Sequence, residues 1–142
     1  MRRVRKEELA RVWPLRRTLV VTDAMDAPDN LAKELVGKLR CAVEMVDSLD
    51  AGLASLETHT PDAVLVVSAT FESCLAALRA LRASPNGGAF SIVALLAHDA
   101  HRNWQALREA GADASYHHPT ATPEIARAIL GVTLSQRTTR AW

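Results

Sequence analysis

Short aliphatic runs recur along the chain, and a longer amphipathic stretch separates each run from the next. The runs cover Thr18–Thr22, Ala42–Val46, Ala63–Val67 and Ser91–Leu96, and a weaker one covers Ala114–His117. Unbroken apolar runs of this length, rich in valine and leucine, are typical of strands that are buried on both faces of a parallel sheet. The pattern therefore predicts five short strands.

The stretches between the runs place apolar residues three and four positions apart, which is the spacing of an α-helix with one buried face. Three helices are predicted with their inward residues: one up to about Leu39 (Leu31, Leu35, Val36 and Leu39), one over Ser48–Glu57 (Leu49, Leu53 and Leu56) and one over Phe71–Ala83 (Leu75, Leu78 and Leu81). Two more are predicted over His101–Ala110 and from a cap at Thr122 to about Leu130 or beyond. Asp29 or Asn30 is expected to cap the first helix, and Gly111 is expected to end the fourth.

Strands that alternate with helices form βαβ units, and these units build a parallel sheet with helices on both faces. The chain has 142 residues, which suits one domain with one hydrophobic core. The predicted fold class is therefore α/β, a flavodoxin-like three-layer sandwich with a five-stranded parallel sheet of order 2-1-3-4-5. Residues 17–134 are expected to form this domain, residues 1–16 a basic N-terminal arm, and residues 135–142 a loose C-terminal tail.

The overall charge does not indicate a partner, because 17 Lys and Arg residues stand against 16 Asp and Glu residues. The basic residues are concentrated at the N-terminus, where the first 17 residues contain seven Lys or Arg and only two acidic residues, Glu7 and Glu8. Such a segment is either a solvated leader or a contact for an acidic partner or nucleic acid.

Cys41 and Cys74 lie in apolar helical contexts without CxxC spacing, so the sequence predicts free thiols and a reducing compartment. The charged N-terminus does not have the apolar stretch of a signal peptide. No apolar run approaches the roughly 20 residues of a membrane-spanning helix. The expected location is cytoplasmic, without a membrane partner.

Four landmarks follow one another in the chain: Leu19–Asp23 at the first strand, Pro61–Val67 at the third, Ala110–Asp113 before the fifth, and His118–Pro119 after it. With these landmarks the chain resembles the receiver domain of response regulators, the CheY-like family, over about residues 17–134. The resemblance implies the same five-stranded fold and a role in bacterial two-component signal transduction.

In that family an acidic pair after the first strand holds Mg²⁺, and an Asp at the end of the third strand accepts a phosphoryl group. A Ser or Thr after the fourth strand and a Lys after the fifth respond to the phosphoryl group. The corresponding positions here are Thr22 and Asp23, Val67, Leu96 and His118. Valine cannot accept a phosphoryl group, and Ser68, one position later, would still have no general base. The resemblance therefore implies a degenerate pseudo-receiver that is not an enzyme and needs no cofactor.

Histidines gather in the sequence where the fourth and fifth strands end, and that edge is where open α/β sheets bind ligands. His98, His101 and His118, together with Asp23, are candidate ligands for Zn²⁺ or a similar ion. His117 and His118 cannot both serve one site, because adjacent strand residues point in opposite directions. A metal- or small-ligand-binding sensor is therefore an alternative function. The other interpretation is that these are loop histidines, one of which replaces the family's lysine.

Receivers usually contact partners through the fourth helix, fifth strand and fifth helix, which here span about residues 104–130. On this face Trp104 and Tyr116 are candidate anchors, and Arg108 and Arg127 can form a basic rim. Packing of Trp104 against the core is the alternative. The expected partner is another signalling protein (a histidine kinase, an output domain or a regulator) or a second copy in a homodimer. A regulator linked to nucleic acid through the basic arm is a rival.

Overall fold

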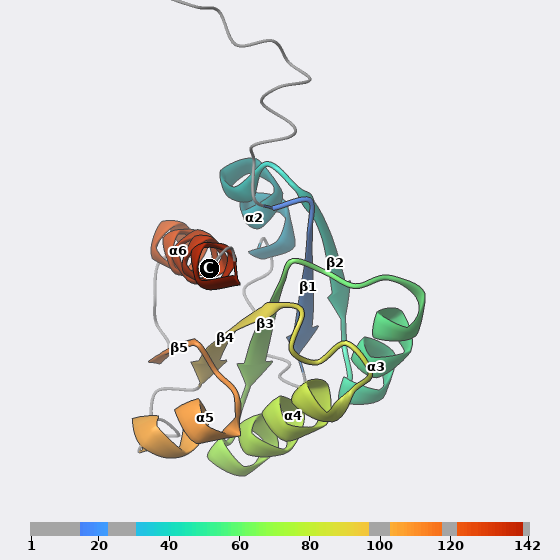
Figure 1. The fold of residues 1–142 in the computed structure, drawn as a ribbon, viewed down its shortest axis with the longest axis vertical. Helices are drawn as coiled ribbons and strands as arrows, with labels where there is room; N and C mark the ends of the chain where they lie inside the picture. Colours follow the sequence, from blue (N-terminus) through green and yellow to red (C-terminus); the bar gives the residue numbers. More distant parts are fainter. Residues whose placement is uncertain (1–14, 23–30, 97–102, 118–121, 141–142) are drawn as a thin grey trace, which may run out of the picture.

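The structure is a computed structural model that describes residues 15–22, 31–96, 103–117 and 122–140, except for the side chains of residues 136–140. Strands and helices alternate along the chain (Figure 1). The elements are β1 (Arg17–Thr22), α2 (Leu31–Leu39), β2 (Ala42–Val46), α3 (Leu49–Thr58), β3 (Ala63–Ser68), α4 (Phe71–Ala83), β4 (Ser91–Leu96), α5 (Trp104–Ala110), β5 (Ala114–His117) and α6 (Thr122–Arg140). All five predicted strands are present, each within one residue of its predicted bounds.

The strands form one parallel sheet of order β2-β1-β3-β4-β5, which confirms the predicted topology. The central strand, β3, is buried over its whole length, whereas the edge strand β2 has no fully buried residue. Thr22 of β1 lies opposite Val67 of β3, and Ser68 of β3 lies opposite Leu96 of β4. The carboxyl ends of three strands therefore meet at one edge.

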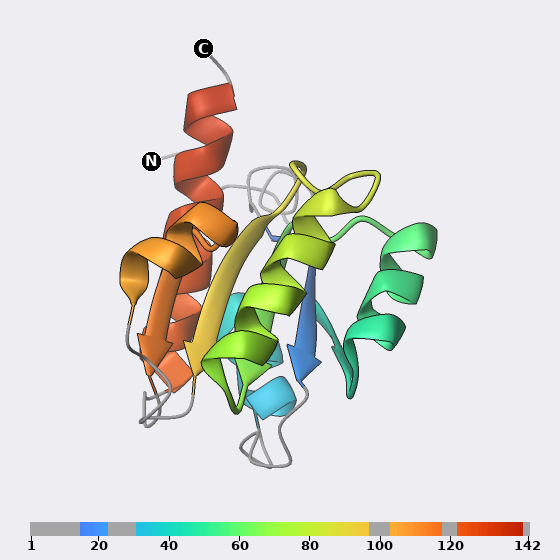
Figure 2. The same cartoon turned by 90° about the horizontal axis from the view of Figure 1, so that it is seen from below.

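Helices cover both faces of the sheet (Figures 1 and 2): α2 and α6 lie on one face, and α3, α4 and α5 on the other. Alternate residues of each strand face different layers, as the pleat of a strand requires. In β3, Val64 and Val66 pack toward α3, α4 and α5, whereas Ala63 and Leu65 pack toward α2 and α6. The core therefore consists of two aliphatic clusters separated by the sheet, which explains why the strands read as continuous apolar runs.

Side chains fix where three of the helices begin. Ser48, Thr70 and Asn103 each accept a hydrogen bond from the backbone N–H three residues later, at 3.0–3.1 Å. These bonds satisfy an N–H group that has no partner within the helix. Gly111 ends α5 with φ of 126°, a conformation that favours glycine and agrees with the predicted helix end. The caps predicted at Asp29 or Asn30, and the helix start at His101, lie outside the described residues.

The prediction that Val36 faces the core is wrong, because its side chain is 45% exposed. Leu31, Leu35 and Leu39 already form the buried stripe of α2, and position 36 lies about 100° around the helix from Leu35. Leu49, Leu53 and Leu75 were predicted to point inward; they are half-buried and pack at the margin of the core. The apolar pattern therefore located the helices better than it located the limits of their buried faces.

The last helix extends past Leu130, as the prediction allows, but it also includes most of the predicted loose tail. α6 continues to Arg140, so residues 136–140 are helical. Thr133 holds this part of α6 to the sheet. Its hydroxyl donates to the Ile129 carbonyl at 2.7 Å and lies 2.8 Å from the Ser91 hydroxyl, a buried contact with β4. Among the described residues, no helix is long and apolar enough to cross a membrane.

Candidate functional site

The first candidate site lies at the carboxyl edge of the sheet, where the structure places three of the predicted positions. Thr22 and Val67 are register partners in neighbouring strands and are 7% exposed each. Leu96 is 1% exposed and belongs to the cluster under α3, α4 and α5, whereas Val67 belongs to the cluster under α2 and α6. Val67 and Leu96 therefore face opposite sides of the sheet and contribute aliphatic surface to two separate packing layers.

The remaining candidates at this edge lie outside the described residues. These are Asp23 and His118, and also His98 and His101 of the possible metal set. Within the parts of the chain that the structure describes, no three His, Cys, Asp or Glu side chains are grouped to hold a metal ion. The described strand ends at this edge thus carry aliphatic side chains, the hydroxyls of Thr22 and Ser68, and the imidazole of His117. Asp47, directly after β2, is a described carboxylate next to them in the sequence.

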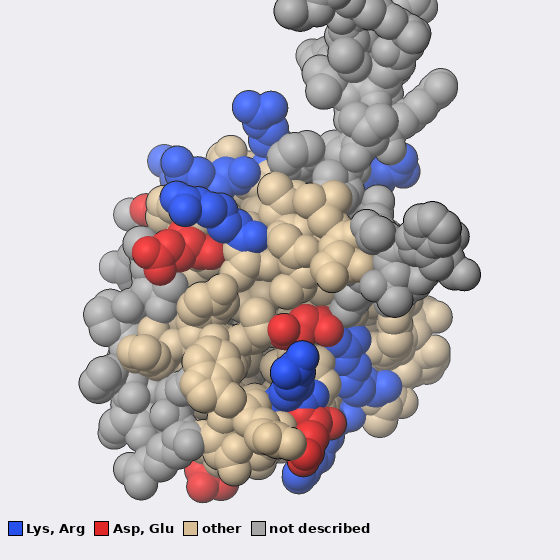
Figure 3. Space-filling view, turned by 60° about the vertical axis from the view of Figure 1, so that its left-hand side comes forward, with Lys and Arg blue, Asp and Glu red and all other residues tan. Residues whose placement is uncertain are grey.

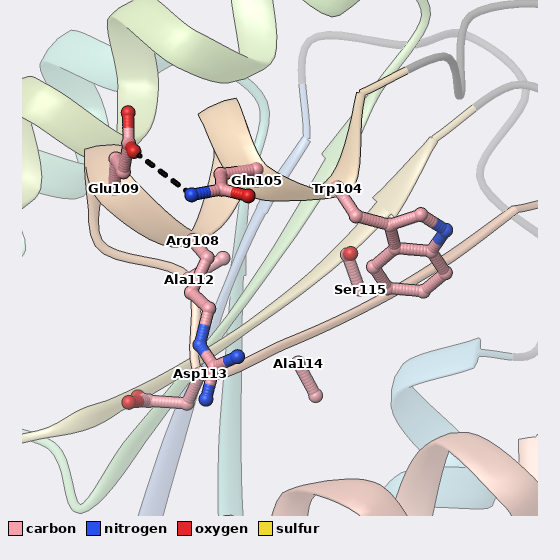
Figure 4. A pocket seen from close by; sticks show the side chains of 8 residues that line it. All are labelled: Trp104, Gln105, Arg108, Glu109, Ala112, Asp113, Ala114 and Ser115. Atoms are coloured by element: carbon pink, nitrogen blue, oxygen red, sulfur yellow. Dashed lines mark hydrogen bonds between the residues drawn. The ribbon is translucent and has the colours of Figure 1, made fainter.

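The second candidate site is a groove between α5 and β5, with a volume of about 470 Å³ (Figure 4). Trp104 lies at one end of the groove beside Ser115, and its side chain is 54% exposed. Arg108 extends from α5 toward Asp113 at the other end. Gln105 donates a hydrogen bond to Glu109 at 3.4 Å along the rim. The groove therefore combines an exposed indole with charged groups of both signs.

The structure brings only two of the four predicted contact residues into this groove, namely Trp104 and Arg108. Tyr116 is half-buried and packs against the cluster under α2 and α6, on the other side of β5 from α5. Arg127 is exposed on α6 and does not line the groove. The side formed by α5, β5 and α6 shows a broad uncharged surface between groups of charged side chains (Figure 3). The high exposure of Trp104 argues against its role as a core residue.

Arg82, near the end of α4, organises the loops at the opposite edge of the sheet and was missed by sequence reasoning. Its guanidinium donates to the carbonyls of Gly87, Phe90 and Gly111 at 2.7–3.0 Å. It also pairs with Asp113 at 3.0 Å and lies 5.4 Å from the centre of the Phe90 ring. Five hydrogen bonds from one side chain therefore join the end of α4 to the loop that follows it and to the turn between α5 and β5.

Two aspartates of the sequence landmarks have structural partners at this amino edge. Asp62 accepts from the backbone N–H groups of Arg16 and Arg17, at 2.7 and 3.1 Å. Asp113 accepts from the backbone N–H of Ile92 at 2.8 Å, and its own N–H donates to the Ile92 carbonyl at 2.8 Å. Each carboxylate therefore fastens the start of a neighbouring strand, which gives these landmarks a role in strand alignment.

Cys41 lies beside β1, where its sulfur is 3.4 Å from the Thr18 hydroxyl. Burial raises the pKa of the Cys41 thiol above its ordinary value; the hydrogen bond with Thr18 opposes this rise, and the charge of Asp62 adds to it. Cys74 is fully buried, and both cysteines are free thiols. Cys41 is therefore a poorly activated thiol and not a nucleophile prepared for chemistry.

Solved receiver domains share this fold. The receiver domain of a sensor histidine kinase from Pseudomonas aeruginosa PAO1, with magnesium in its active-site cleft, aligns with a TM-score of 0.63 at 23% identity, over 82% of this chain and 98% of its own. A CheY-like receiver domain from Methylobacillus flagellatus aligns with a TM-score of 0.66 at 24% identity, over 84% and 98%.

A putative two-component response regulator with a GGDEF domain aligns with a TM-score of 0.67 at 20% identity. The match covers 90% of this chain and 52% of that protein, so this chain spans about half of its length. No family model matches the chain, and no curated protein matches it in sequence. At identities of 20–24% these likenesses concern the fold and leave the chemistry of the site to be argued from its own residues.

Proposed function

We propose that this chain, which has the fold of a response-regulator receiver domain, acts as a phosphorylation-independent receiver, a protein-interaction module in two-component-type signalling. One observation carries the proposal. Val67, at the strand end where the family resemblance places the phosphoryl acceptor, is a buried aliphatic residue packed between the sheet and α2 and α6. A valine side chain has no lone pair with which to attack phosphorus.

The surroundings of Val67 support the same conclusion. A phosphoryl group carries two to three negative charges, and it needs a metal ion, hydrogen-bond donors or a fixed cation nearby. Leu96 replaces the expected switch hydroxyl and is 1% exposed within an aliphatic cluster. Burying an anion against such side chains without partners is strongly unfavourable. A signal must therefore reach this domain through binding or abundance and not through transfer of a phosphoryl group.

The test is incubation of the full chain with acetyl phosphate or beryllofluoride and Mg²⁺, followed by intact-mass and NMR measurements. We expect no mass increase and no chemical-shift change at Val67 or its neighbours. A receiver with an intact acidic site, treated in the same way, is the positive control. A stable phosphoryl adduct on any aspartate would refute phosphorylation independence.

The groove between α5 and β5 is the proposed contact surface. Tryptophan and arginine, which line the two ends of this groove, are among the residue types that dominate protein interfaces. Truncation of a tryptophan that an interface buries costs at least about 2 kcal/mol. The partner would be a histidine kinase, an output domain or a second copy of this chain. Trp104→Ala should therefore weaken self-association or partner capture about thirtyfold, while the circular dichroism spectrum stays unchanged.

Met45→Ala is the matched control, because Met45 is a large apolar residue, 39% exposed, on the opposite edge strand β2. Analytical ultracentrifugation measures self-association, and pull-down with the immobilised full chain measures capture of kinases or regulators. If Trp104→Ala binds every partner as strongly as Met45→Ala does, the groove is not the contact surface. If Trp104→Ala unfolds, Trp104 is a core residue after all.

A further inference from the structure

A small cavity opens between α3 and α4 at the carboxyl ends of β1 and β3, with a volume of about 170 Å³. Its walls are aliphatic: Val21, Val66 and Val67 come from the strands, Leu49 from α3, and Ala76 and Ala77 from α4. No charged side chain is among the described residues that line it. The cavity therefore does not suit a metal ion or a phosphate, and its apolar walls favour an uncharged ligand.

Two hydroxyl groups reach the cavity, and only one of them is already engaged. The Ser73 hydroxyl donates to the Thr70 carbonyl at 3.1 Å and accepts from the Thr70 hydroxyl at 2.9 Å. Ser68 is 3% exposed, and over the described parts of the chain its hydroxyl takes part in no hydrogen bond. A buried hydroxyl without a partner is unfavourable by about 1–3 kcal/mol, so a ligand that pairs with it gains affinity.

The strand geometry explains why the Ser68 hydroxyl points into this cavity. In β3, Ser68 lies two residues after Val66, so the two side chains share the face covered by α3 and α4. At residue 68 the strand ends, and only two residues separate it from the first residue of α4. The hydroxyl therefore lines the cavity at the carboxyl end of β3.

We propose that this cavity is a binding site for a small, uncharged molecule with an apolar ring or branched aliphatic body and one hydrogen-bonding group, which pairs with the Ser68 hydroxyl. The size agrees, because an apolar protein cavity of about 150 Å³ holds a benzene molecule. The site lies at the same edge of the sheet as Val67. Its use as the input of the signalling module rests on the proposed function, whereas the binding itself does not.

Phenol and toluene test the site, because they have nearly the same shape and differ in one hydrogen-bonding group. Each is titrated into the 142-residue chain, and backbone and methyl NMR signals of the cavity residues are followed. We expect saturable shifts there with phenol, with a Kd of about 1 mM or tighter. Ser68→Ala should weaken phenol binding about fivefold and leave toluene binding unchanged, since a net hydrogen bond has roughly that effect.

Ala76→Leu should weaken both probes at least tenfold, because Ala76 lines the cavity and a larger side chain there takes up part of its volume. Ala83→Leu is the matched control: it makes the same change on the same helix, at an exposed position that does not line the cavity. The proposal is overturned if neither probe saturates at the cavity, if phenol affinity is the same in Ser68→Ala, or if Ala83→Leu weakens binding as much as Ala76→Leu. A phosphoryl adduct after incubation with acetyl phosphate would refute the proposed function. The binding results with phenol and toluene would still stand.

Discussion

Arg82→Ala should be among the most destabilising single substitutions at the amino edge of the sheet. The substitution removes the donors to three backbone carbonyls, those of Gly87, Phe90 and Gly111. Phe90 is fully buried, so its carbonyl cannot turn to solvent without moving the start of β4. The side chain of Arg82 itself is 22% exposed, so water can replace some of the lost hydrogen-bond donors.

The magnitude follows from these contacts. Each carbonyl that loses its donor contributes about 1 kcal/mol, the lower end of the usual range, because water has partial access. The ion pair with Asp113 contributes at most about 1 kcal/mol, since both side chains are partly exposed. We therefore expect Arg82→Ala to lower the free energy of unfolding by about 3–4 kcal/mol. Arg82→Lys should lose about 2 kcal/mol, because an ammonium group cannot span all three carbonyls at once.

Urea denaturation followed by circular dichroism measures these differences, provided that the m-value stays constant. Arg79→Ala, an exposed arginine one turn earlier on α4, is the control and should stay within about 0.5 kcal/mol of wild type. High salt should leave most of the Arg82→Ala deficit in place, because the carbonyl contacts are hydrogen bonds and not ion pairs. A deficit under 1 kcal/mol relative to the control would show that Arg82 does not hold these loops together.

Other parts of the molecule give predictions of the same kind. Gly111→Ala should cost at least about 2 kcal/mol in denaturation experiments, because φ is 126° and the new Cβ would overlap the Arg82 side chain. Thr133→Val should cost about 1–2 kcal/mol, and a double-mutant cycle with Ser91→Ala should show a coupling of at least 0.5 kcal/mol; additive effects would contradict their buried hydrogen bond. Iodoacetamide at pH 8 should alkylate Cys41 more slowly than free cysteine, because the raised pKa of Cys41 leaves less thiolate. Urea should remove the difference, and equal rates in the folded protein would contradict the prediction.

The sheet could be predicted from the sequence because burial on both faces leaves a simple signal. β3 reads as an unbroken aliphatic run and is buried at every residue, so its identity and bounds were predicted within one residue. The βαβ connections restrict the topology to a few parallel arrangements, and five strands in a chain of this length favour the flavodoxin-like order among them. The limits of the buried helical faces were harder to predict from the sequence. Val36 shares the apolar character of its neighbours, and only its angle around α2 places it in solvent.

The candidate sites were predicted unevenly, because each depends on a different kind of information. The identities of Val67 and Leu96 were read directly, but their separation onto opposite faces of the sheet requires the register between β3 and β4. The contacts of Arg82 were not predictable from periodicity, since they depend on carbonyl groups from two loops, one of which lies 29 residues away in the sequence. The only local signals were the turn at Gly87 and the glycine and aspartate before β5. A buried hydroxyl such as Ser68 is likewise recognisable only when its neighbours in space are known.

The two aspartates at the amino edge have a consequence for how this domain can change over evolutionary time. Asp62 ties the start of β1 to β3, and Asp113 ties the start of β5 to β4. These carboxylates thus help to fix strand alignment at one end of the sheet, through contacts that do not involve the other end. Substitutions at the carboxyl ends of the strands can then replace one set of functional side chains by another, while the strands themselves stay in place. The domain thereby separates the residues that preserve its architecture from those that are free to acquire a new use.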